Sequence, residues 1–143
     1  LGSVSFGDYA GVLANQLFNS YAVSPSKTKL EVDVHPVSLG LDQAIPCGLI
    51  LNELITNCLK HAFPNETKGA LKVILSQEGG RCFLTVADTG VGIPSDQLSG
   101  KPRSLGMRLI RTLTQQIDGQ IEFSNTEPGT VARLSFPIHG NSA

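Results

Sequence analysis

The sequence has few cysteines, no long basic segment and no apolar segment of membrane-spanning length. Its three cysteines, Cys47, Cys58 and Cys82, lack the C-x-x-C spacing of zinc sites and do not form the pattern of a disulfide framework. We expect them to be small apolar residues of a reduced, cytoplasmic protein. The formal net charge of −1 argues against nucleic acid as the main partner, so any anion-binding site must be local.

The absence of a signal peptide and of a long apolar segment predicts that this domain makes no membrane contact. The chain begins at Leu1 without a methionine, so we interpret it as part of a longer protein, which can itself be soluble or membrane-anchored. Hydrophobic residues make up 41% of the 143 residues and charged residues 16%, which is typical of globular proteins. No repeat or linker divides the chain, so we expect residues 1–143 to form a single domain.

The segment from Leu49 to Pro64 predicts an amphipathic helix, which Pro64 limits at its C-terminal end. Its polar side carries a carboxylate, a carboxamide, a cation and an imidazole, which can face a polyanion and its metal. A plain solvent-exposed face is an equally good interpretation of this helix alone. The polar side comprises Glu53, Asn57, Lys60 and His61. The apolar side comprises Leu51, Leu54, Ile55, Cys58 and Ala62.

The N-terminal half predicts one helix and two strands before this long helix. The first helix is expected at 8–21, with Asp8 as its N-cap. Alternating apolar and polar residues predict a strand at 29–34. Asp42 is expected to cap the long helix, and Pro46 to lie within about its first turn. The residues expected to face inward from a short second strand are Val37, Leu39 and Leu41.

The C-terminal half predicts two pairs of strands separated by a helix. Gly79-Gly80 is a hairpin signal between the first two strands, and Asp118-Gly119 ends the helix with a turn. Strands are expected at 70–77, 81–87, 120–125 and 130–137, and the helix at 105–117. The whole order, αββαββαββ, predicts an α+β fold: a two-layer sandwich with helices on one face of a mixed, mostly antiparallel sheet.

Three glycine segments follow the long helix. In Asp88-Thr-Gly-Val-Gly92, Gly90 and Gly92 let the backbone approach a ligand closely, and Asp88 can accept a hydrogen bond from an exocyclic amine. Ser104-Leu-Gly-Met107 opens a helix, whose first N–H groups bind phosphate well. Gly129-Thr130 precedes the last strand. Each segment alone is a weak signal, because ordinary turns look the same.

In this order, the segments N-E-L-x-x-N-x-x-K-H-A, D-T-G-V-G-I, S-L-G-M-R and G-T resemble the ATP-binding domain of sensor histidine kinases. That domain belongs to the GHKL superfamily, with gyrase, the Hsp90 chaperones and MutL. The resemblance covers residues 28–138 and implies the Bergerat-type ATP-binding fold. The sequence of residues 49–64 and the very short lid at 95–104 are similar to those of the HWE and related branch of sensor kinases. Residues 1–24 resemble the segment that leads in from dimerisation helices.

The resemblance implies a role for each polar residue of the long helix. Asn57 matches the ligand of a Mg²⁺ ion that the nucleotide phosphates hold. Glu53 matches the acidic residue that acts as a general base in the superfamily's ATPases and assists phosphotransfer in kinases. Lys60 and His61 match the pair that contacts phosphates and ribose. Glu53 and Lys60 are thus the implied catalytic residues.

Further nucleotide contacts are implied in the glycine segments. Asp88 matches the residue that binds the adenine amino group, and Thr130 matches the threonine that helps to hold adenine. Gly90 and Gly92 match the first glycine box of the family. The remaining implied contacts are Ile93, Leu105, Gly106 and Met107.

The implied function is to bind Mg²⁺ and ATP and to transfer the γ-phosphoryl group to a histidine in a two-component signalling system. That histidine lies on a separate dimerisation domain of the same parent protein, and a response regulator is an indirect partner. None of the three histidines here, His35, His61 and His139, lies in such a context. Two alternatives stay open: an anti-sigma-factor serine kinase, and a non-catalytic nucleotide-binding module.

Overall fold

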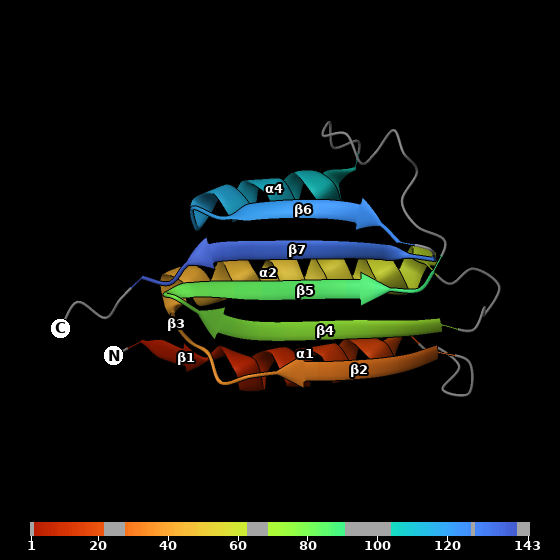
Figure 1. The fold of residues 1–143 in the computed structure, drawn as a ribbon, viewed down its shortest axis with the longest axis horizontal. Helices are drawn as coiled ribbons and strands as arrows, with labels where there is room; N and C mark the ends of the chain where they lie inside the picture. Colours follow the sequence, from red (N-terminus) through yellow and green to blue (C-terminus); the bar gives the residue numbers. More distant parts are fainter. Residues whose placement is uncertain (1, 22–27, 63–68, 91–103, 127, 140–143) are drawn as a thin grey trace.

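The computed structural model describes residues 2–21, 28–62, 69–90, 104–126 and 128–139, with His61 and Ala62 described through their backbone only. The main layer is a five-stranded sheet in the order β2-β4-β5-β7-β6 (Figure 1). β2 pairs with β4 in parallel, and the other neighbours are antiparallel. The expected mixed, mostly antiparallel sheet is therefore confirmed. Its strands are β2 (Thr28–Val34), β4 (Gly69–Glu78), β5 (Arg81–Asp88), β6 (Gln120–Asn125) and β7 (Thr130–Pro137).

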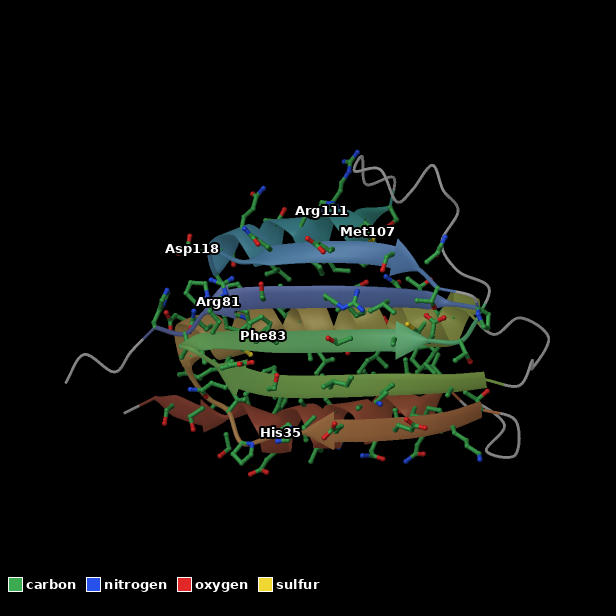
Figure 2. All side chains as sticks on the ribbon, viewed as in Figure 1. His35, Arg81, Phe83, Met107, Arg111 and Asp118 are labelled. Carbon is green, nitrogen blue, oxygen red and sulfur yellow. The ribbon has the colours of Figure 1, made fainter. Side chains whose placement is uncertain are left out.

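The helices form a second layer on one face of this sheet, as the sequence predicted (Figure 1). α2 contacts both α1 and α4. Arg81 and Phe83 of β5 lie on the other face of the sheet (Figure 2). None of the described helices is long and apolar enough to cross a membrane. The helices are α1 (Phe6–Ser20), α2 (Leu41–Asn57) and α4 (Leu105–Gln116).

The core forms where every second residue of the central strands meets the helices. Leu71, Val73 and Leu75 of β4 are fully buried, and each such side chain stabilises the fold by about 1.5–3 kcal/mol. Gly79 and Gly80 join β4 to β5 with φ angles of +57° and +76°, the left-handed conformations of a tight hairpin. The alternation and the glycine pair therefore fix the register of the two strands that lead to the site.

The N-terminal segment differs from the sequence prediction. A three-residue strand, β1 (Ser3–Ser5), pairs with β3 (Ser38–Gly40) in a small separate sheet. β1 is too short to show an alternating pattern. α1 then begins at Phe6, so the prediction that Asp8 caps it is wrong; Asp8 lies in the first turn instead. The earlier start is explained by Phe6, which is completely buried in the core.

The start of α2 also corrects the prediction. Gly40 is its N-cap residue and Leu41 its first residue, so Leu41 does not face inward and is 53% exposed. Asp42 does not cap the helix; its Oδ2 lies 3.0 Å from His139 Nδ1. Pro46 lies in the second turn, where its ring is buried. The helix thus starts two residues earlier than predicted.

Gln43 ties the end of β7 to the start of α2. Its side chain is 1% exposed, and its Nε2 donates to the carbonyl of Pro137 at 2.7 Å. Its Oε1 accepts from the backbone N–H of His139 at 3.1 Å.

At the end of α4, Asp118 takes the left-handed conformation with φ +53°. Gly119 is required next, because a Cβ there would lie 2.9 Å from the carbonyl oxygen of Ser135.

Candidate functional site

Four chain segments that are distant in sequence converge at one end of the sheet. The C-terminal ends of α2 and β5 lie beside the N-terminal ends of α4 and β7, at the right-hand end of Figure 1. These are the segments that carry the polar helix residues and the glycine motifs. The sheet order explains the convergence, because β7 pairs with β5 and α4 packs against α2.

Asp88 is a buried polar residue of this end. It is the last residue of β5, and only 6% of its surface is exposed. Its Oδ1 accepts a hydrogen bond from the N–H of Gly90 at 2.8 Å. Its Oδ2 accepts one from the thiol of Cys58 at 3.1 Å. Each oxygen of a carboxylate can accept about two hydrogen bonds, so acceptor capacity remains for a ligand.

The Cys58 thiol stays protonated beside this carboxylate. Burial raises its pKa well above the ordinary value, and the negative charge of Asp88 and the hydrogen bond to it raise the pKa further. The thiol is therefore a hydrogen-bond donor at neutral pH. The sequence placed Cys58 on the apolar side of the helix, which is correct for its packing. A helical pattern contains no information about the strand that the side chain meets.

The walls around Asp88 come from the neighbouring strands. Thr130 is the direct partner of Asp88 in the β5–β7 pair and is 8% exposed, and its Oγ1 donates to Oδ1 of Asn125 at 3.3 Å. Gly129 has φ +109°, and a Cβ there would collide with the carbonyl oxygen of Asp88. Thr89 is fixed to β4, since its Oγ1 accepts from the N–H of Ala70 at 2.9 Å. The backbone around Asp88 is therefore held from both sides.

The second half of the site lies between α2 and α4. A Cβ on Gly106 would lie 2.7 Å from Oε2 of Glu53, so the half-buried carboxylate of Glu53 lies against the first turn of α4. Ser104 caps α4 by accepting from the N–H of Met107 at 3.1 Å. A negative charge is stabilised at this end of a helix. Met107 is half-buried, whereas Leu105 is 82% exposed.

The end of α2 departs from the regular helix that the sequence predicted. After Asn57, the chain forms a π-helical turn, η1 (Cys58–Ala62), which places side chains differently from an α-helix. Asn57 is half-buried. Lys60 is exposed, and its Nζ lies 6.0 Å from the centre of the Tyr21 ring at the end of α1. Glu53 and Asn57 thus share the helix face, whereas Lys60 lies toward α1.

Residues 42–140 match the family described as histidine kinase-, DNA gyrase B- and HSP90-like ATPases. The chain belongs to this family. It is 27% identical over 136 residues to blue-light-activated histidine kinase 2 of Erythrobacter litoralis, covering 94% of this chain and 39% of that protein. It is 33% identical over 112 residues to the sensor histidine kinase YdfH of Bacillus subtilis, covering 78% of this chain and 26% of that protein. The chain therefore spans well under half the length of these relatives.

Solved structures show the same relationship. The histidine kinase domain of the Erythrobacter litoralis EL346 blue-light-activated histidine kinase superposes with a TM-score of 0.87 at 27% identity, covering 94% of this chain and 66% of that one. The catalytic domain of histidine kinase ThkA, at 16% identity and a TM-score of 0.71, shows the shared fold alone. The ATPase-family resemblance of the sequence and its fold are thus confirmed, and this is an ATP-binding domain of the histidine kinase type. The narrower HWE branch stays a prediction.

Several residues matched to the family lie outside the described part of the chain. Gly92, Ile93 and most of the short lid at 95–104 are among them, as is the side chain of His61. Among the described residues, no three His, Cys, Asp or Glu side chains gather into a metal-binding cluster. Asn57 and Glu53 supply oxygen donors about one turn apart. Such a set fits Mg²⁺, which takes only one or two protein ligands when phosphates and water supply the others.

Proposed function

We propose that this ATPase-family domain binds Mg·ATP and transfers the γ-phosphoryl group to a histidine on a separate dimerisation domain of the same parent protein. The response regulator of a two-component system is then the indirect partner. One observation carries the proposal: a buried, doubly hydrogen-bonded Asp88 lies at the same end of the fold as the capped N-terminus of α4, where Glu53 meets Gly106. The carboxylate proposed to recognise the base and the helix N-terminus proposed to bind phosphate thus lie at the same end of the fold.

The adenine end of the proposed site is built around Asp88. A carboxylate only accepts hydrogen bonds, so it selects an exocyclic amine and repels a carbonyl oxygen at the same place. Thr130, opposite Asp88 in the sheet, is the matching polar group on β7. Burial strengthens the selection, because an unpaired acceptor is costly where water is excluded.

The phosphate end is built by α2 and α4. The N–H groups at the start of α4, including that of Gly106, suit phosphate oxygens. In this proposal Asn57 holds the metal ion. When bound, that ion supplies positive charge beside the phosphates. Glu53 orients the attacking histidine or removes its proton, and Lys60 offsets charge on the phosphoryl group. In the structure Lys60 lies over Tyr21, so this role requires its flexible side chain to turn toward the nucleotide.

Neither described histidine side chain lies near this end, which supports an acceptor on another domain. His35 follows β2 at the opposite end of the sheet, and its Nε2 lies 3.5 Å from Asp33 (Figure 2). His139 contacts Asp42 at the start of α2. Asp42 precedes Glu53 by eleven residues, which is about 16 Å of helix. Phosphoryl transfer requires the attacking atom within about 3.5 Å of its target.

The helix layer offers an apolar surface for such a domain. Leu105 and Leu109, one turn apart on α4, are 82% and 40% exposed. Neighbouring exposed apolar residues beside a site are typical of interaction surfaces. Leu105 begins the helix whose N-terminus faces the proposed phosphates, so a domain docked there can present a side chain to the γ-phosphate.

Radiolabelled ATP tests the transfer. The chain alone should acquire no label, whereas addition of the parent's dimerisation domain should produce label on that domain at a rate that depends on both concentrations. A phosphohistidine is labile in acid and stable in base. Replacing the acceptor histidine by Asn in the added domain is the matched control and should abolish the label. Acid-labile label on the chain alone contradicts the proposal, and acid-stable label on a serine-containing partner favours the anti-sigma-factor kinase.

A further inference from the structure

We propose that Cys58 is a positioning residue of the nucleotide site, which sets the selectivity for adenine by fixing the carboxylate of Asp88. The inference rests on the proposed function, in which Asp88 faces the base. It assigns a role to Cys58, which is not among the polar residues that the sequence predicted for the site.

The two hydrogen bonds of Asp88 come from different parts of the chain and hold different oxygens. The N–H of Gly90, two residues later, holds Oδ1 at 2.8 Å. The thiol of Cys58, thirty residues earlier and on the π-helical turn after α2, holds Oδ2 at 3.1 Å. With Gly90 alone, the carboxylate can rotate about its Cβ–Cγ bond and exchange oxygens. With both donors in place, the plane of the carboxylate is fixed relative to the base.

A fixed carboxylate discriminates between bases better than a mobile one. The carboxylate accepts from the 6-amino group of adenine, whereas the 6-carbonyl of guanine presents a second acceptor to it. A mobile carboxylate can turn away from the guanine carbonyl, which reduces that penalty. Removing the thiol should therefore weaken ATP binding and strengthen GTP binding relative to ATP.

The thiol is suited to this task because its S–H is a hydrogen-bond donor within reach of the carboxylate. Its Sγ lies 3.1 Å from Oδ2 of Asp88. Serine at this position keeps an O–H donor, and alanine removes the donor with little change in the helix. Cys58→Ser and Cys58→Ala are thus a matched pair that differ in one oxygen atom.

Calorimetric titrations with ATP and with GTP test the inference on the wild-type chain and four variants. Cys58→Ala should bind ATP about threefold to tenfold more weakly, the usual effect of one lost hydrogen bond, with a smaller ratio of ATP to GTP affinity. Cys58→Ser should keep both values near wild type. Cys82→Ala, which removes a buried thiol near the start of β5, away from Asp88, should also keep them. Asp88→Asn is the reference for loss of the carboxylate.

The outcomes separate this inference from the proposed function. If Asp88→Asn weakens ATP binding and Cys58→Ala keeps the wild-type affinity and ratio, the inference is wrong and the proposed function stands. If the wild-type chain does not bind ATP, both fail. If Cys58→Ala and Cys58→Ser lose affinity equally, the sulfur acts through packing and the positioning role is overturned. Urea unfolding of each variant shows whether the binding-competent fold is retained.

Discussion

The candidate site contains two carboxylates in different surroundings. Asp88 is nearly inaccessible and is held by two donors, as suits a group that recognises a base. Glu53 is half-buried against Gly106, where a reacting group can reach it. In the proposed function, base recognition by Asp88 and reaction at Glu53 thus follow from the different burial and hydrogen bonding of the two carboxylates, not from their residue types.

The metal role of Asn57 gives the first prediction. Asn57→Ala should weaken Mg·ATP binding by about tenfold, or about 1.4 kcal/mol, because it removes the oxygen that the residue offers to the cation. Binding of adenosine without Mg²⁺ should be unchanged. Calorimetry with both ligands measures the two effects, and Asn52→Ala is the control, since Asn52 is also half-buried on α2. An equal loss for adenosine identifies Asn57 as a structural residue.

The contact between Glu53 and Gly106 gives the second prediction. In Gly106→Ala the new Cβ lies 2.7 Å from Oε2 of Glu53, so the carboxylate must move. Phosphoryl transfer to an added dimerisation domain should slow by at least about tenfold, because general acid–base groups contribute about 10²–10⁴-fold when correctly placed.

The matched control for Gly106→Ala is the same substitution in a Glu53→Gln background. There it should have little further effect, since residues that act through one group are not additive. An equal slowing in both backgrounds shows that Gly106 acts independently of Glu53, which contradicts the proposed contact.

The sequence located most of these residues but not their mutual contacts. The glycine motifs pointed to Asp88, Gly90 and Gly106, and Gly106 is needed where the first turn of α4 approaches Glu53. Cys58 was missed as a site residue, since its only sequence signal, an apolar position in a helix, is shared with core residues. Lys60 was grouped with Glu53 by an α-helical angle, and the π-helical turn after Asn57 changes that angle.

Among the secondary-structure elements, the β5–β7 pair and the residue that precedes β7 determine the shape of the adenine end. Gly129 stands immediately before β7 and touches the backbone at Asp88. Its φ of +109° lies where only glycine is comfortable. The glycine–threonine pair, a plain turn signal in the sequence, is therefore a packing requirement of the site.

Gly129→Ala should lower the free energy of unfolding by at least about 2 kcal/mol, because the substitution combines a strained backbone angle with a collision. Gly79→Ala is the control, since its φ is also positive but a Cβ there has no atom within 4 Å. It should lose only about 1–2 kcal/mol, the usual cost of a left-handed residue. Urea unfolding monitors both variants, and equal losses exclude the collision as the cause.

Element boundaries were less predictable than element types. The strands from 70 onward were placed to within about a residue, because alternation and the glycine hairpin act together there. The strand predicted at 29–34 also agrees with β2 to within a residue, whereas β1 was missed and α1 begins two residues earlier than predicted. β1 and β3 are stabilised by pairing with each other, which no local pattern of three residues reveals. α2 likewise begins where Gly40 pairs with Ser3 and the N–H of Leu41 donates to the carbonyl of Gly2, contacts with a segment distant in sequence.

In the molecule as a whole, the cysteines link stability to pH. Burial raises the pKa of the Cys82 thiol from 9.0 to about 12. Between these values the folded chain keeps a proton that the unfolded chain has lost, so the unfolding free energy falls as pH rises. This contribution is complete below pH 9 and disappears by about pH 12.

Comparison with Cys82→Ala isolates this effect from the other groups that titrate in alkali. Above pH 9 the wild-type chain should lose stability faster than the variant by up to about 1.4 kcal/mol per pH unit. Urea unfolding at pH 7, 8, 9 and 10 gives the two curves. Parallel curves across this range show that Cys82 titrates normally in the folded chain.

The most direct test of the proposed site is a calorimetric titration of ATP, with Mg²⁺, into the wild-type chain and into Asp88→Asn. The wild-type chain should bind one ATP. Asp88→Asn replaces one acceptor by an N–H donor that faces the adenine amine in a buried place, and should weaken binding by about 1–3 kcal/mol while the fold is retained. An affinity for ATP that is the same in the two proteins contradicts the placement of the base at Asp88, and with it the site built around this residue.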